Sequence, residues 1–198
     1  MKATNKLKAT LGLQTKLLNR KIDYDGTQLR SLFAYLDHGV LGNSLVAFRG
    51  ACSISFAHMV DGEDLREQSP ICGDDMLHFI AEIFDENLFA GVLFQRLLAS
   101  LACDLVNEIT KKKRVFREGD DLYSSDGRKL SISIAAKSVQ SVMVHFAVNV
   151  TNKGTPVKTL SLQDLNIQPK DFAQSLLKRV ALEFDSIRAA TMKVKPLG

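Results

Sequence analysis

The chain contains little cysteine, and none of it has the spacing of a metal site or a disulfide framework. Cys52, Cys72 and Cys103 lie at wide intervals in 198 residues. Neither a Cys-x-x-Cys pair nor a Cys/His ligand spacing is present, so the sequence supports neither a zinc site nor a disulfide scaffold. A reducing compartment fits this pattern, and we expect a cytoplasmic protein.

Long uncharged apolar runs are also missing. The longest apolar stretch, Leu88 to Val106, is interrupted by Gln95, Arg96 and Asp104. Charges at those depths argue against a membrane span, so we interpret the stretch as a buried helix filling the centre of the domain. The N-terminus has no apolar segment long enough for a secretory signal. We therefore expect no membrane partner.

Acidic residues are absent from the first twenty positions, which contain five basic side chains: Lys2, Lys6, Lys8, Lys16 and Arg20. We interpret residues 1–20 as a basic N-terminal extension and residues 21–198 as one folded domain. The net charge of +4, from 26 basic and 22 acidic residues, mildly favours anionic ligands. It is too small to argue for nucleic acid, which ranks third among the functions considered.

The most informative segment runs from Arg117 to Val150 and is predicted to form three consecutive antiparallel strands. Asp126-Gly127 indicates a tight hairpin turn, and Gln140-Ser141 marks a second turn. Apolar residues alternate with small or polar ones on either side of the second turn. The alternating apolar positions are Leu130, Ile132 and Ile134, then Val142, Val144, Phe146 and Val148.

The remaining elements complete an α+β domain. Residues Asp61 to Asp75 form a polar loop whose length is typical of functional loops. Pro169 opens a last helix with one apolar face, which we expect to cover the sheet. The other predicted elements are a short helix Thr27 to Leu36, strands Ser44 to Ile54 and Leu77 to Phe84, and a long helix Leu88 to Ile109.

Two segments resemble motifs of enzymes that handle biotin and lipoate. GDDLYSSDGRKL is similar to the biotin ligase pattern in which Lys-Trp-Pro-Asn-Asp is followed by a turn and Gly-Arg-Lys-Leu. SVMVHFAVNV resembles the His-Gly-x-Ala-Leu-Asn-Val strand of octanoyltransferases. Across its length after Lys21 the chain also resembles an uncharacterised family, domain of unknown function family 366. The matching segments are YDGTQLRSLFAYLDHGVLGNSLVAFRG, GDDLYSSDGRKLSISIA and SIRAATMKVK.

This resemblance implies a single biotin/lipoate ligase-like domain, similar to the core of class II aminoacyl-tRNA synthetases. The expected features are a mostly antiparallel sheet, a central buried helix and a C-terminal amphipathic helix. The resemblance implies the fold more firmly than it implies a reaction, because one fold supports many chemistries.

The resemblance also implies a set of site residues. Lys129 matches the lysine that contacts the activated acyl group and the phosphates, and Asp121 and Asp120 match the acidic and amide positions beside it. Lys129 and Asp121 are the candidate catalytic residues, since an ammonium stabilises charge that builds on phosphate oxygens. Asp120 and Asp121 are candidate ligands of Mg²⁺, held against ATP.

Six further residues are candidates for binding the ligand or nucleotide: Arg49, Gly50, His78, Arg117, His145 and Asn149. His145 and Asn149 lie four apart on one predicted strand, so their side chains share a face. Considered alone, each of these residues also fits a structural role, such as a surface lysine or a hydrogen-bonded core histidine.

The sequence departs from both enzyme patterns. Only Arg49-Gly50 remains of the repeated glycine/arginine loop of biotin ligases, Glu118-Gly119 replaces Trp-Pro, and Ile132 replaces a glycine. The segment after Val150 contains no cysteine, so the thioester mechanism of the transferases is not supported.

Two functional hypotheses follow. In the first, the protein activates a small carboxylic acid with ATP and Mg²⁺ and transfers the acyl group to an amine or a carrier protein. In the second, it is a non-catalytic ligand-binding or interaction protein on the same scaffold. The retained Asp-Asp…Gly-Arg-Lys motif favours the first, and the missing glycine/arginine loop favours the second. The acid, the acceptor and the oligomeric state, including a homo-oligomer, stay open.

Overall fold

A five-stranded sheet forms the centre of the fold in the computed structural model, which describes residues 12–197. Its strand order is β1-β2-β3-β7-β6, with β1 parallel to β2 and every other neighbour antiparallel. Its strands are β1 Gln14–Leu17, β2 Ser44–Ile54, β3 Ile71–Phe84, β6 Ser131–Lys137 and β7 Ser141–Asn149. Strands β4 Val115–Glu118 and β5 Asp121–Ser124 form a separate two-stranded sheet. The helices are α1 Phe33–His38, α2 Gly62–Glu67, α3 Leu88–Thr110 and α4 Pro169–Met192.

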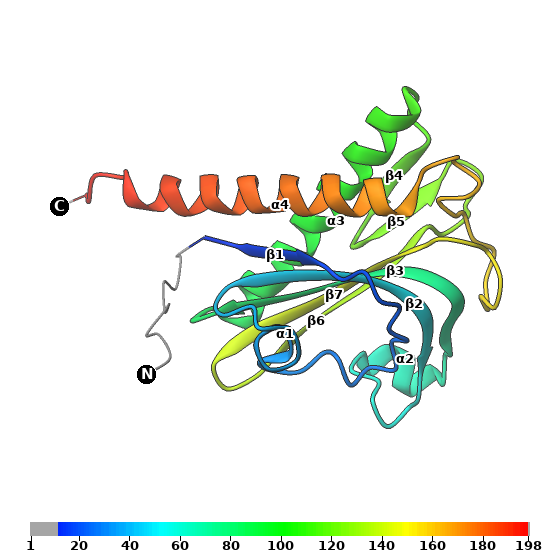
Figure 1. Cartoon of the computed structure of the whole chain (residues 1–198), viewed down its shortest axis with the longest axis horizontal. Helices are drawn as coiled ribbons and strands as arrows, with labels where there is room; N and C mark the ends of the chain where they lie inside the picture. Colours follow the sequence, from blue (N-terminus) through cyan, green and yellow to red (C-terminus); the bar gives the residue numbers. More distant parts are fainter. Residues whose placement is uncertain (1–11, 198) are drawn as a thin grey trace, which may run out of the picture.

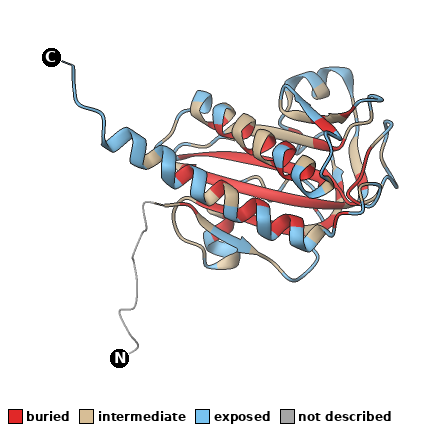
Figure 2. Cartoon of the chain, turned by 90° about the horizontal axis from the view of Figure 1, so that it is seen from above, coloured by how far each residue is buried: buried red, intermediate tan, exposed pale blue. Residues whose placement is uncertain are grey.

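One face of the sheet packs against α3 and α4 (Figures 1 and 2). The period of two along a strand puts alternate residues on this face. From β7 these are the apolar residues predicted to alternate, Val142, Val144, Phe146 and Val148. From α4 they include Phe172, Leu176, Leu177, Val180 and Phe184, so the predicted amphipathic cover is confirmed.

The sequence led us to expect that helix α3 is buried on most sides, but one side of it is exposed. Phe94, Leu98 and Ala102 pack into the core, whereas Phe89 and Leu93 are exposed. By length and composition alone α3 could cross a membrane, but half of its most apolar stretch is buried inside the domain. Packing against the sheet therefore accounts for its apolar character.

The opposite face of the sheet carries a smaller core. Tyr24 and Phe33, from the segment between β1 and β2, pack there on Phe48, Met76 and Ile80 of the sheet. Helices α1 and α2 lie on this side of the molecule, away from α4 (Figure 1). This second face is the one that carries the candidate site.

The predicted arrangement of Arg117 to Val150 needs one correction. Strands β6 and β7 are antiparallel neighbours as expected, but β5 leaves the main sheet and pairs with β4. Strand β5 contacts the start of β6 through the Tyr123–Lys129 bridge and a hydrogen bond from the backbone N–H of Leu130 to the carbonyl of Leu122. Gly127 has a φ of 79°, which is the left-handed conformation that the Asp-Gly turn requires.

Other boundaries also shifted. Strand β2 matches its prediction, β3 begins six residues earlier than Leu77, and α1 covers only the end of Thr27 to Leu36. Residues 14–17, placed by the sequence in the basic extension, form β1 and pair with Ser44 to Ala47. A four-residue edge strand with a basic composition gives too short a pattern to distinguish from a tail. The extension's earlier residues lie outside the described part.

The chain preceding Tyr24 depends on a close approach to Gly50. A Cβ at Gly50 would lie 2.0 Å from the carbonyl oxygen of Ile22, which is a backbone atom that cannot move aside easily. We expect Gly50→Ala to lower the free energy of unfolding by about 1–3 kcal/mol, the range for overpacking. Urea denaturation measures this change. Gly62→Ala is the control, because no heavy atom lies within 4 Å of its added Cβ. Equal stability of the two variants would contradict this packing.

Candidate functional site

A cavity of about 440 Å³, here called the main cavity, opens at the start of β6. Its walls come from the segment 61–72 with α2, from the β5–β6 region, and from the loop 155–159. Four candidate residues named from the sequence line it: Asp120, Asp121, Lys129 and Asn149. The lining as a whole brings together segments as far apart in the chain as Asp61 and Thr159.

Lys129 and Asp121 form an ion pair at this cavity. The Lys129 Nζ lies 2.6 Å from Asp121 Oδ2, and the side chains are 29% and 18% exposed. Burial alone would lower the pKa of Lys129, but the charge of Asp121 and its hydrogen bond raise that pKa above its usual value. Burial raises the pKa of Asp121, and attraction to Lys129 offsets only part of that rise. The other carboxylate oxygen, Asp121 Oδ1, is buried without a hydrogen-bond partner.

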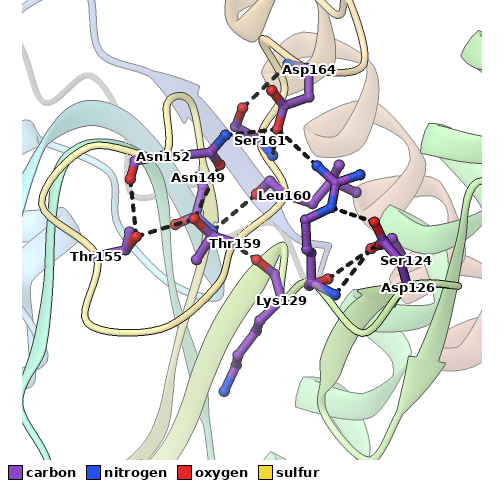
Figure 3. Close-up of polar contacts among 11 residues, drawn as sticks. Ser124, Asp126, Lys129, Asn149, Asn152, Thr155, Thr159, Leu160, Ser161 and Asp164 are labelled. Carbon is purple, nitrogen blue, oxygen red and sulfur yellow. Dashed lines mark hydrogen bonds and ion pairs between the residues drawn. The ribbon is translucent and has the colours of Figure 1, made fainter.

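The backbone of Lys129 is fixed from two sides. Its N–H donates to the carbonyl of Lys158 at 3.1 Å, and its carbonyl accepts from the N–H of Leu160 at 3.0 Å. Asn149 Nδ2 donates to the carbonyls of both Lys129 and Leu160, at 3.1 and 3.2 Å. Figure 3 shows the Lys129 side chain leaving this network, so only its ammonium end is free to meet a ligand.

The loop after β7 is held by a polar network around Asp164 (Figure 3). Asp164 Oδ2 accepts from Asn152 Nδ2 at 2.8 Å and lies 3.6 Å from Arg128 NH1. Thr159 Oγ1 donates to Asn152 Oδ1 at 3.1 Å. The same Thr159 Oγ1 lies 3.1 Å from Thr155 Oγ1. This network places Thr155 and Thr159 at the wall of the main cavity.

Asp120 is committed to helix α3. Its Oδ2 accepts from Gln95 Nε2 at 2.8 Å and from Ser133 Oγ at 3.0 Å, and its Oδ1 lies 3.3 Å from Arg96 NH1. These contacts leave Asp120 with less capacity for a metal than Asp121 has. In residues 12–197 no group of three or more His, Cys, Asp or Glu side chains could hold a metal ion.

A second space of about 50 Å³, here called the slot, adjoins the main cavity. Asp61, Asp64, Ile71, Ile132 and Ser133 line both spaces. Most other slot residues are apolar, and Tyr24 and His145 also line the slot. The ring centroids of Tyr24 and His145 are 3.8 Å apart and stacked. His145 therefore lies in the slot rather than in the main cavity.

Four candidates lie away from the main cavity. His78 is fully buried, with its ring 3.1 Å from His145 and 3.3 Å from the carbonyl of Gly50. Arg49 follows Phe48 on β2, so it points to the opposite face, where it pairs with Asp75 beside the start of α4. Arg117 is exposed on β4 and donates to the carbonyl of Gly119. Gly50 packs closely against the backbone of Ile22, as described above.

The expectation that Arg49, His78, Lys129 and Asn149 share one cavity is therefore wrong for Arg49 and His78.

The sequence reasoning missed the acidic wall supplied by α2. Asp61 caps this helix by accepting from the N–H groups of Glu63 and Asp64, and all three side chains line the main cavity. Burial, then the charge of Asp61, raises the pKa of Asp64. With Asp120 and Asp121, carboxylates outnumber the one ammonium at this cavity. The length of the polar loop Asp61 to Asp75 was the signal that could have identified them.

Comparison with known proteins places the chain among uncharacterised archaeal proteins. It is 33% identical over 184 residues to an uncharacterized protein of Methanocaldococcus jannaschii, an alignment that spans 89% of this chain and 82% of the relative. The solved structure of a protein of unknown function from Pyrococcus horikoshii is 38% identical. It superposes with a TM-score of 0.90 over 94% of this chain and 100% of that one.

The fold extends this likeness to biotin and lipoate protein ligases. The biotin protein ligase of Aquifex aeolicus, solved with biotin and ATP, is 14% identical, with a TM-score of 0.56 over 88% of this chain and 71% of the ligase. At this identity the likeness shows a shared fold, and the predicted fold class is confirmed. The family model for a domain of unknown function matches residues 13–195. The chain thus belongs to the family described as domain of unknown function DUF366.

Proposed function

We propose that the protein activates a small carboxylic acid with ATP and Mg²⁺, and then transfers the acyl group to an amine. The observation that carries this proposal is the Lys129 ammonium, held by its fixed backbone at the wall of the main cavity beside Asp121. The fold shared with a ligase that was solved with biotin and ATP supports it.

The chemistry requires a preorganised cation. When a carboxylate oxygen attacks the α-phosphate of ATP, an acyl-adenylate forms and pyrophosphate leaves; negative charge builds on the phosphate oxygens, and a fixed ammonium stabilises that charge. The amine would then attack the acyl carbon, lose a proton and expel AMP. Asp121 keeps Lys129 protonated, because their attraction raises the pKa of Lys129. Lys129 would meet the acid's carboxylate and the nucleotide phosphate in turn. Asn149 acts as a positioning residue, since its amide holds the backbone of Lys129.

The acidic wall fits the two cationic participants of this reaction. Mg²⁺ typically takes one or two protein carboxylates and completes its shell with phosphates and water. Asp121 Oδ1 is unpartnered and could supply one such ligand, whereas the oxygens of Asp120 are engaged with Gln95, Ser133 and Arg96. An amine acceptor would also be drawn toward Asp61, Glu63 and Asp64, because a cleft of one charge attracts the opposite charge.

A second candidate is a protein that binds a small acid without activating it. The position of Arg49 favours this alternative, because that guanidinium pairs with Asp75 on the other face and leaves Lys129 as the cation lining the main cavity. The two candidates differ in their need for nucleotide.

A thermal-shift screen separates them, with ATP/Mg²⁺, biotin, lipoate and octanoate added singly and together. A ligand at about one hundred times its dissociation constant adds about 2.7 kcal/mol to the free energy of unfolding. Activation predicts shifts with both acid and ATP/Mg²⁺, whereas simple binding predicts a shift with acid alone. No shift with any acid would contradict both.

Lys129→Ala should suppress acid-dependent exchange of labelled pyrophosphate into ATP about a hundredfold or more, the scale for losing one preorganised electrostatic group. Lys158→Ala is the matched control, because that lysine lies on the neighbouring segment, is exposed, and does not line the main cavity. Its exchange rate should be unchanged. Thermal unfolding of both variants separates lost chemistry from lost fold. Undiminished exchange in Lys129→Ala would remove Lys129 from the mechanism.

Asp121→Asn should become more stable relative to the wild type as pH rises from about 3 to about 7. Burial holds the pKa of Asp121 above its unfolded value, so across that window the folded wild type binds more protons than the unfolded chain. The free energy of unfolding of the wild type therefore falls as Asp121 loses its proton. The Asp121→Asn variant has no proton to lose at this position, so its stability does not fall in this way. Urea denaturation at both pH values measures the difference. The opposite trend would show that pairing with Lys129 outweighs burial.

The same variant tests the metal role. If Asp121 is a ligand of Mg²⁺, Asp121→Asn should need a higher Mg²⁺ concentration for half-maximal exchange. Asp120→Asn provides the comparison, because Asp120 is held by Gln95, Ser133 and Arg96.

A further inference from the structure

The buried histidine pair at the slot has a fixed arrangement of protons. His78 Nε2 lies 3.3 Å from the carbonyl oxygen of Gly50, and a carbonyl can only accept, so this nitrogen carries the hydrogen. Burial lowers the pKa of His78 to about 4 and that of His145 well below its usual value, which leaves both rings neutral at pH 7. In a neutral ring with a hydrogen on Nε2, Nδ1 is a bare acceptor.

The second ring follows from the first. His145 Nε2 lies 3.1 Å from the bare Nδ1 of His78, so His145 must donate from Nε2. Its own Nδ1 is therefore also bare, and within the described residues it has no hydrogen-bond partner. His145 is 1% exposed and lines the slot. Among the described residues, His145 Nδ1 is not one of the fully buried polar atoms that lack a hydrogen bond, so it keeps slight access to the slot, where a ligand's donor can reach it.

We propose that the slot receives the far end of the acyl chain, and that this end carries a neutral hydrogen-bond donor, a hydroxyl or an amide N–H, which His145 Nδ1 accepts. This inference rests on the proposed function, because the carboxylate end is taken to meet Lys129. It adds a substrate class, an acid with a donor at its distal end, and it assigns the specificity to His145.

The dimensions agree with an acid of medium length. Ile134 of β6 is the register partner of His145, and it lies five residues after Lys129, which precedes β6, about 16 Å at the usual rise per residue of extended chain. The Lys129 side chain spans part of that distance. The slot has room for about one or two water-sized groups, which suits a chain terminus and excludes a bulky ring system.

The slot also disfavours a charged end. Leu29, Ile54 and Met59 line it near His145, and an ammonium among them would lose its hydration, while the carboxylates of Asp61 and Asp64 lie where the slot meets the main cavity. A plain methyl end would fill the space but leave His145 Nδ1 without a partner. A site that hydrogen-bonds a ligand's hydroxyl rejects the analogue that lacks it, because the buried group is then unpaired.

Calorimetry with three acids tests this selection: octanoate, 8-hydroxyoctanoate and 8-aminooctanoate. We expect 8-hydroxyoctanoate to bind the wild type about tenfold or more tightly than octanoate does, and 8-aminooctanoate to bind weakest. Equal binding of octanoate and 8-hydroxyoctanoate would overturn this inference and leave the proposed function intact. Preferential binding of 8-aminooctanoate would also overturn it, since Asp64 rather than His145 would then bind the distal end of the acid. No binding of any acid would overturn the proposed function together with this inference.

Two histidine variants assign the selection to one ring. His145→Phe keeps a ring against Tyr24 but removes the acceptor, so the hydroxyl preference should disappear. His58→Phe is the matched control, because His58 lines the same slot but is exposed and has no place in the buried pair. Loss of preference in His58→Phe instead would overturn the assignment to His145.

Histidine-selective ¹⁵N NMR of the free wild-type protein is independent of ligand and of variant folding. We expect His78 and His145 both to carry a hydrogen on Nε2 and none on Nδ1 at pH 7. The chain has four histidines, so single substitutions at His38 and His58 suffice to separate the buried pair from the others. A hydrogen on His145 Nδ1, or a doubly protonated ring, would overturn the inference even if the acids bind.

Discussion

The candidate site exists because the two faces of the sheet are covered unequally. Helices α3 and α4 bury one face, while the segments before and after β2, with the short helices α1 and α2, lie on the other. The segment before β2 brings Tyr24 and Phe33 onto the second face, and the start of β6 is left to the main cavity. Every polar group on this face must then be paired within the protein or meet a ligand.

This constraint explains why the polar residues of the second face differ so much in their surroundings. His78 and Asn149 are buried and use their hydrogen-bonding groups on other protein atoms. They shape the site without being offered to a ligand. Lys129, in contrast, is held entirely through its backbone, which leaves its ammonium to Asp121 and the cavity. A cation fixed in this way loses little further conformational entropy when a ligand binds.

The fold was predictable from the sequence where an element had a strong period. The alternation of Val142, Val144, Phe146 and Val148 gave β7 and its core face, and the apolar stretch from Leu88 gave α3. Strand β1 was missed because its four residues carry no such pattern and gain their place from pairing with β2. The separation of β5 from the main sheet depends on contacts that no local pattern contains.

The site was predictable only in part, for a physical reason. Family motifs named Lys129, Asp121 and Asn149, which lie close together because the turn at Gly127 and the β6–β7 pairing are local. Arg49 was misplaced because one position along a strand reverses the face, so its neighbour Phe48 points to the second face and Arg49 does not. The acids of α2 reach the cavity through a tertiary approach from a distant loop, so the length of that loop indicated a functional segment but could not place its carboxylates near Lys129.

One unpartnered polar atom lies at the main cavity and another at the adjoining slot. Asp121 Oδ1 is buried without a hydrogen bond beside Lys129, and His145 Nδ1 lacks one at the slot. Leaving Asp121 Oδ1 buried and unpaired costs about 1–3 kcal/mol, so the stability of the fold does not explain its arrangement. An unpartnered oxygen at the main cavity and an unpartnered nitrogen at the adjoining slot are what an elongated ligand with a polar group at each end would require.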